Sequence, residues 1–307
     1  MKKRMCRTIS ATMPIFLCMG ALAMALVEND ALAADLALPT EDELVSNLDL
    51  TCHKVDGEVK PPIRELTIRH LNPVLQDMGF KDEKIELYEM NQLCVPVAKN
   101  QVKPPSPAYE FIEWIDLACY QAKSNTSQQA DLFLEHRNPV LKKMGLPNEE
   151  VVMFDLQQLC VPVMKNGVKP PDSVRWLVEH VDVACYDIDS IGDFFPFDLQ
   201  LTHLNPVLQE LGFKEQRIVA YRPEQLCVPV MKNDRIPPKE ALEIVQWIDF
   251  EKYAVDPGQN TPFIPLKLGH LNPLFQQSDA FEVKVLENQA LAVPVKKNLK
   301  PPFVWWH

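Results

Sequence analysis

The chain has 307 residues and a formal net charge of −11, and it is 47% hydrophobic and 24% charged, which is typical of a globular protein. Phosphate binding needs clustered Lys and Arg, so this acidic balance argues against nucleic acid and anionic membrane surfaces as partners. Only nine residues are glycine and no two of them lie two positions apart, which excludes glycine-rich phosphate loops of the GxG type.

The first 33 residues have the pattern of an export signal. Residues 1–7 are positively charged, residues 9–27 are mostly apolar, and Ala31 and Ala33 form an A-x-A pattern. This order predicts a secretory signal peptide that is cleaved after Ala33. An uncleaved membrane anchor is the alternative, but Pro14 and the A-x-A pattern favour cleavage. We therefore expect an exported protein, in the periplasm or outside the cell of a Gram-negative-type bacterium, with no stable membrane insertion after cleavage.

Four copies of one unit follow the signal at a period of 65–67 residues. Each copy contains a block such as HLNPVL, a block such as LCVPVAKN and a proline pair, always in that order. Recurrence at a fixed period is the mark of a repeat architecture. The predicted segments are a signal peptide at 1–33, repeat modules at 34–105, 106–171 and 172–238, and a cysteine-free C-terminal cap at 239–307.

Within each copy, the patterns predict a mainly β unit with one short helix. A segment such as YEFIEWIDLACY alternates in its last half, which predicts a strand, whereas its first half has helical spacing in the third copy. A second strand such as ELTIRHL follows, and Asn-Pro then begins a short helix that ends at a glycine. KIELYEM predicts a further strand. The block that contains VPV predicts the last strand of the copy, and its Pro favours an edge or bulged position for that strand.

We expect these units to form four sandwich-like modules of ~66 residues, arranged as an elongated array. In such arrays each repeat contacts mainly its neighbours, and a terminal repeat departs from the pattern as a cap. The fourth copy fits a cap, because it has neither cysteine nor the helix-ending glycine.

Six cysteines remain after the signal, two in each of the first three copies. Six cysteines permit many pairings, but the fourth copy has Lys252 at the first cysteine position and Ala292 at the second. The loss of both together indicates a bonded pair, because a lone survivor would be a free thiol. Metal binding is the alternative, but two thiolates per unit are too few without histidine partners. The predicted disulfides are Cys52–Cys94, Cys119–Cys160 and Cys185–Cys227.

Three polar positions recur in all four copies and are candidate ligand-binding residues. The histidine before Asn-Pro suits a metal ligand or an acid/base, or a structural hydrogen bond to the helix start or a loop carbonyl. The aspartate and the lysine suit a small-ligand contact in each unit, or an ion pair with each other. No HExxH or HxxxH motif is present, so the sequence identifies no metal. The candidates are His70, His136, His203, His270, Asp49, Asp116, Asp182, Asp249, Lys99, Lys165, Lys232 and Lys297.

Two further repeated positions predict structural roles. Trp114, Trp176 and Trp247 follow the first three copies, and their spacing predicts packing between neighbouring units, with a carbohydrate-stacking surface as the alternative. The asparagine after the repeated lysine is typical of a turn with left-handed backbone. These asparagines are Asn100, Asn166, Asn233 and Asn298.

A hydrolase is poorly supported. The chain has no GxSxG motif, and no serine is shared by all four copies. Catalytic groups usually occupy one place in a protein, whereas the notable polar residues here recur four times. We therefore predict a non-enzymatic protein with no catalytic residues and no cofactor.

The motif string CY…HLNPVL…LCVPVxKN…PP…DLxCY resembles tandem repeats of an uncharacterised family of exported bacterial proteins, a domain of unknown function. The resemblance covers about residues 44–302. It implies an exported protein of small β-rich modules and carries over no activity. The fourth copy departs from the pattern because it lacks both cysteines.

Together these observations predict an exported binding or scaffold protein that presents one weak site per module. Its partner would be an unknown protein or glycan of the envelope or the extracellular space. The alternatives are a periplasmic metal- or carbohydrate-binding protein that uses the repeated His, Asp and Lys positions, or a secreted hydrolase.

Overall fold

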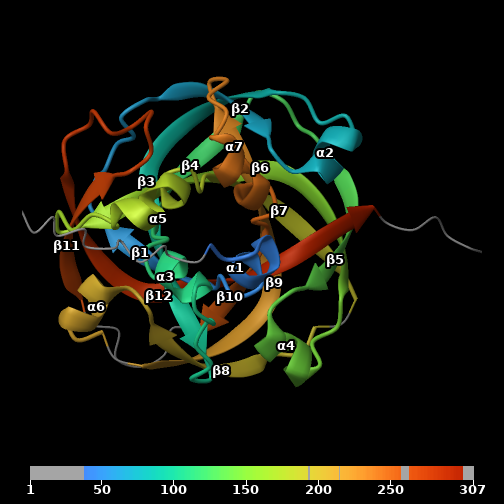
Figure 1. Cartoon of the computed structure of the whole chain (residues 1–307). Coiled ribbons are helices and arrows are strands. Elements are labelled where there is room, and N and C mark those ends of the chain that lie inside the picture. The colour runs from blue at the N-terminus through green and yellow to red at the C-terminus, as the bar shows by residue number, and fades with distance from the viewer. Residues whose placement is uncertain (1–37, 193, 214, 257–262, 300–307) are drawn as a thin grey trace, which may run out of the picture. The chain divides into compact units, whose positions relative to one another are not determined.

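The computed structural model of the protein describes residues 38–192, 194–213, 215–256 and 263–299 (Figure 1). Strands account for 52% of the structure and helices for 16%, which confirms the mainly β class. In these ranges no helix is long and apolar enough to span a membrane. The predicted signal peptide lies outside the described residues.

All of the described strands belong to one sheet, and they pair in antiparallel fashion. The strands are β1 (Leu50–Asp56), β2 (Glu65–His70), β3 (Glu83–Lys99), β4 (Leu117–Ser124), β5 (Ala130–His136), β6 (Glu149–Lys165), β7 (Val183–Ile191), β8 (Phe197–His203), β9 (Gln216–Lys232), β10 (Phe250–Asp256), β11 (Ile264–His270) and β12 (Phe281–Leu299). The helices are α1 (Glu41–Val45), α2 (Pro73–Asp77), α3 (Ala108–Ile112), α4 (Pro139–Met144), α5 (Asp172–Val178), α6 (Pro206–Glu210) and α7 (Lys239–Val245).

Each unit supplies these elements in the same order. A short helix leads into the strand that carries the first cysteine position, a hairpin strand follows, and a long strand carries the second cysteine position. The predicted helices after Asn-Pro are present in the first three units, where the asparagine side chain accepts a backbone N–H of the first turn. The fourth unit, which lacks the glycine, has turns at this place instead of a helix.

The proline of the VPV block lies inside the long strand and not in an edge strand. The strand is bulged, as the alternative prediction has it, since the register of β3 against β4 shifts between Leu87 and Gln92. Pro96 lies where one neighbour of β3 changes, since β4 pairs as far as Cys94 and β8 pairs from Val97 onward. The missing N–H of Pro96 therefore removes no ladder hydrogen bond on that side, and its carbonyl accepts from the Leu204 N–H at 2.9 Å. KIELYEM and the VPV block thus form one continuous strand.

Eight strands close into a ring. The cysteine strands β1, β4, β7 and β10 alternate with the long strands β3, β6, β9 and β12, and β12 pairs back to β1. A closed sheet has no free edge strand that could pair with another chain.

The hairpin strands extend this pairing across the ring. β2 pairs with β9, β8 with β3, β5 with β12, and β11 with β6, so each hairpin strand joins units that are two apart in the sequence. Every unit consequently shares strand pairs with all three others. The expected elongated array of sandwich-like modules is therefore wrong, because the last residues of each long strand are paired by a strand of the unit two away in the sequence.

The four leading helices pack on one another in the order α1, α3, α5, α7 and back to α1, and Figure 1 shows them around the centre of the ring with α2, α4 and α6 outside. Their buried apolar residues share a core with the cysteines. Trp114, Trp176 and Trp247 pack against this core, and the Trp176 ring lies 6.1 Å from that of Phe111 in the preceding unit. These contacts favour the predicted role at unit junctions.

The three predicted disulfides are confirmed. The S–S distances are 2.03 Å for Cys52–Cys94, 2.07 Å for Cys119–Cys160 and 2.03 Å for Cys185–Cys227. Each bond joins residues that lie directly opposite each other on paired strands.

Candidate functional site

The repeated aspartates and lysines form buried ion pairs within each unit. Asp116 and Lys165 are at most 2% exposed, and burial raises the pKa of the carboxyl and lowers that of the ammonium, while each charge opposes the shift of the other. The pairs are Asp49–Lys99, Asp116–Lys165, Asp182–Lys232 and Asp249–Lys297.

The asparagine of each Asn-Pro motif connects this pair to the next unit. Asn205 donates to Asp116 at 2.8 Å and to the backbone carbonyl of Glu113, while its own oxygen caps α6. The same contact joins Asn138 to Asp49, Asn272 to Asp182 and Asn72 to Asp249, at 2.6–3.0 Å. The aspartates and lysines therefore bond within the protein, which favours their structural interpretation over ligand binding.

The repeated histidines are buried and point across the ring. The Nε2 atom of His270 lies 2.9 Å from the Tyr120 hydroxyl, and His70 and His136 face Tyr186 and Tyr253 at 3.4 and 3.5 Å. In each case the tyrosine belongs to the unit two away in sequence, rather than to the adjacent helix start. His203 faces His53, which replaces the tyrosine in the first unit, with ring centroids 5.7 Å apart.

One of these histidine sites carries additional acids. His136, Glu149 and Glu251 place ligand atoms within 4.8 Å of one another, and all three side chains are buried. The Tyr253 hydroxyl lies 2.6 Å from Glu251 Oε2 and 3.1 Å from Glu149 Oε1. Glu251 has alanine or threonine counterparts in the other units, so this acid was not among the repeated residues. Among the described residues, this group is the one that could hold a metal ion.

A second site outside the sequence candidates lies at the ring interior. The Lys252 ammonium donates to the side-chain oxygens of Gln92, Gln158 and Gln225 at 2.7, 2.7 and 3.0 Å. Burial lowers the pKa of Lys252 to about 7, and a cavity of about 490 Å³ adjoins it. All three ammonium protons are engaged, so Lys252 acts as a non-covalent link where other units have a disulfide.

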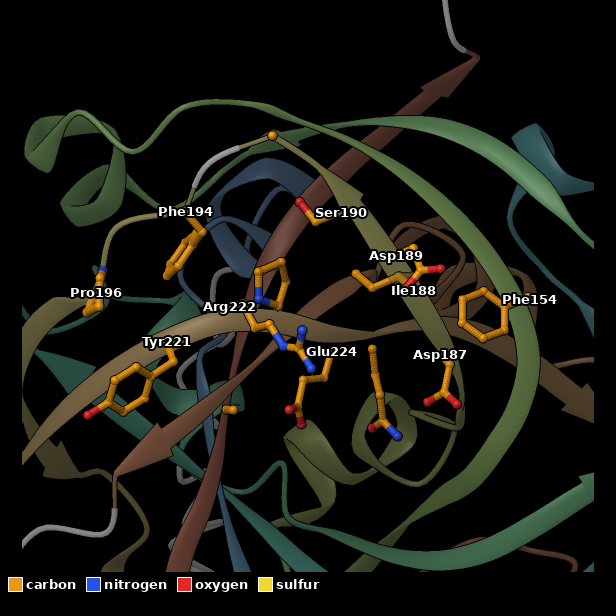
Figure 2. A pocket seen from close by; sticks show the side chains of 14 residues that line it. Phe154, Asp187, Ile188, Asp189, Ser190, Phe194, Pro196, Tyr221, Arg222 and Glu224 are labelled. Atoms are coloured by element: carbon orange, nitrogen blue, oxygen red, sulfur yellow. The ribbon is translucent and has the colours of Figure 1, made fainter.

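An open cleft of about 880 Å³ lies between β6, β7 and β9 (Figure 2). In this view, Arg222 and Glu224 lie between the rings of Phe154 and Tyr221. Both rings occupy the position six residues before the second cysteine of their unit, as does Tyr88 in the first unit. This aromatic repeat was present in the sequence but was not identified there as a site.

The cleft wall also contacts the buried acids. Ser190 lines the cleft and donates to Glu149 Oε2 at 2.6 Å. Phe194, which also lines it, lies 5.4 Å from the Tyr253 ring, centroid to centroid. The group of His136, Glu149 and Glu251 is therefore one residue layer behind the cleft.

No family model, curated protein or solved structure matches the chain.

Proposed function

We propose that this protein is an exported, non-enzymatic binding protein whose ligand is a saccharide held in the cleft between β6, β7 and β9. The observation that carries the proposal is a pair of aromatic rings, Phe154 and Tyr221, with charged groups between them. Saccharides combine apolar C–H faces with many hydroxyls. Binding sites for such ligands combine apolar and aromatic surface with a few placed polar groups.

The cleft offers both kinds of contact. Tyr221 is 40% exposed, so its ring is accessible to a ligand. Asp187, Glu224 and Arg222 supply carboxylate acceptors and guanidinium donors along the cleft. Burial raises the pKa of Asp187, and the charges of Asp155 and Glu224 raise it further, while an amide hydrogen bond from Gln157 at 2.7 Å opposes the shift.

The repeated histidines, aspartates and lysines do not enter this proposal, because all of them are buried and the aspartates pair with the lysines. The proposal of an exported location rests on the signal-like amino terminus together with three disulfides, which persist in oxidising compartments.

The test is binding of the mature chain to a panel of immobilised oligosaccharides, followed by calorimetry on any that bind. We expect Phe154→Ala and Tyr221→Ala each to weaken binding by about tenfold, equivalent to about 1.4 kcal/mol. Tyr88→Ala is the matched control, because it removes the ring at the same repeat position outside this cleft. Failure of the wild type to bind, or equal effects of all three variants, would contradict the proposal. Release of reducing sugar would contradict its non-enzymatic part.

A further inference from the structure

The four histidine sites are related by the repeat, but their acids differ. The position eleven residues before the second cysteine is Glu83, Glu149, Gln216 or Phe281 in the four units. His70 thus has one acid beside it, with 3.5 Å between Nε2 and Glu83 Oε1. His136 is accompanied by Glu149 from its own unit and by Glu251 from the unit across the ring.

Strand pairing sets the positions of these three side chains. His136 ends β5, Glu149 begins β6, and Glu251 lies near the start of β10. β5 pairs with both β6 and β12, and β12 also pairs with β10. The three residues are therefore held by the sheet itself rather than by a loop, which favours a defined coordination geometry.

The acids lack a compensating cation. Glu251 is 0% exposed and Glu149 is 7% exposed, and the described residues contain no Lys or Arg ion pair with either carboxyl. Two potential ligand atoms, Glu251 Oε1 and His136 Nδ1, are buried without a hydrogen-bond partner. Ionising a buried carboxyl without a compensating cation is unfavourable by several kcal/mol, so a cation at this place would stabilise the ionised pair.

We propose that His136, Glu149 and Glu251 bind one first-row transition-metal dication, with Zn²⁺ as the best fit. One imidazole nitrogen and two carboxylate oxygens form a mixed donor set that suits Zn²⁺ better than the all-oxygen preference of Ca²⁺ or Mg²⁺. Bonds of about 2.1 Å would need donor atoms about 3.4 Å apart. The present atoms lie within 4.8 Å of one another, so binding would draw them closer together.

The surrounding hydroxyls would orient the ligands. Ser190 donates to Glu149 Oε2 at 2.6 Å, and the Tyr253 hydroxyl lies 2.6 Å from Glu251 Oε2. Partners of this kind fix the orientation of metal-binding carboxylates in many sites. The metal would join the second and fourth units at the place where their strands meet across the ring.

The test is metal analysis of the untagged mature chain after stripping with a chelator, loading with ZnCl₂ and extensive dialysis. We expect one zinc per wild-type chain and none above the buffer blank in Glu251→Gln or Glu149→Gln. His70→Gln is the matched control and should keep the zinc, because it changes the equivalent histidine of another unit. Far-ultraviolet circular dichroism establishes that each variant is folded.

Loading with Co²⁺ gives a second readout, because cobalt bound to nitrogen and oxygen donors absorbs visible light. We expect this absorption in the wild type and in His70→Gln, and its loss in Glu251→Gln. The proposal would be overturned if the folded wild type held no zinc after dialysis, or if folded Glu251→Gln still held one zinc per chain. No saccharide is present in either measurement, so this result is independent of the proposed ligand in the cleft.

Discussion

Asp116 accepts from Lys165 within its unit and from Asn205 in the next, and equivalent contacts occur at all four junctions. Each aspartate thus neutralises a buried lysine and links neighbouring units. The recurrence of these residues in the sequence follows from this shared structural role.

We predict that Asp116→Asn lowers the free energy of unfolding by about 3–5 kcal/mol, because it leaves Lys165 buried without a counter-charge. Urea denaturation at neutral pH measures the change. Asp198→Asn is the control, since the Asp198 side chain is 62% exposed, and it should shift the free energy by less than about 0.5 kcal/mol. Equal effects of the two variants would show that the buried pair is not important for stability.

The burial of His270 predicts that the folded protein becomes less stable as the pH decreases. Burial lowers the pKa of the histidine to about 4, with a further contribution from the charge of Lys232. Between pH 6.5 and 4 the unfolded chain binds a proton at this site and the folded protein does not, so stability falls as the pH decreases through this range. The site accounts for about 2 kcal/mol of loss at pH 5.

The measurement is the urea midpoint and slope of wild type and His270→Gln at pH 7 and pH 5. The variant lacks the titrating group beside Tyr120 and Ser278, so it should lose about 2 kcal/mol less than the wild type over this interval. An identical loss in both proteins would place the acid sensitivity elsewhere.

At the scale of elements, β10 and β12 pair as the disulfide-bonded strands of the other units do, but they have no cysteines at the paired positions. Lys252 lies opposite Ala292, in the register that Cys52 and Cys94 have on β1 and β3. Lys252 instead holds three glutamine side chains from the other units.

Lys252→Cys combined with Ala292→Cys should therefore form a fourth disulfide. The closed loop would span about 40 residues, which in the chain-entropy model is worth about 4 kcal/mol. The reference is Lys252→Ser, which removes the ammonium without adding a bond, and the oxidised double variant should be more stable than it by about that amount. Non-reducing peptide mapping detects the link, and two free thiols in the folded protein would contradict the register.

Several elements could be predicted from the sequence because their signals are local or repeated. The joint loss of both cysteines in the fourth copy was sufficient to pair the other six, and Asn-Pro identified three helix starts. Pro96 lies in a central strand and not at an edge, because a proline is excluded from such a strand only where its N–H would face a partner. Here the change of partner from β4 to β8 occurs at that residue, and local sequence does not report it.

For the whole molecule, the strand pairing differs from the elongated array that the sequence predicts. Similar units can stack in a line or close on themselves, and the choice depends on pairings such as β5 with β12, between residues more than 150 positions apart. No period in the sequence encodes that contact. The same limitation hid the group of His136, Glu149 and Glu251, although an acid in a strand where other copies have alanine or threonine was a visible signal.

The pairing of β5 with β12 across the ring brings the second and fourth units together and creates the proposed metal site, so it is the central claim. Glu135 and Lys296 lie opposite each other on β5 and β12. The direct test combines Glu135→Cys with Lys296→Cys, oxidises the dilute protein and maps the links without reduction.

The pairing of β5 with β12 predicts an intramolecular disulfide between the two introduced cysteines in the monomer. Lys296→Cys combined with Lys239→Cys, on elements that do not pair, should stay unlinked. Free thiols or only intermolecular dimers from the protein with Glu135→Cys and Lys296→Cys would contradict the account, because they would show that the second and fourth units do not meet.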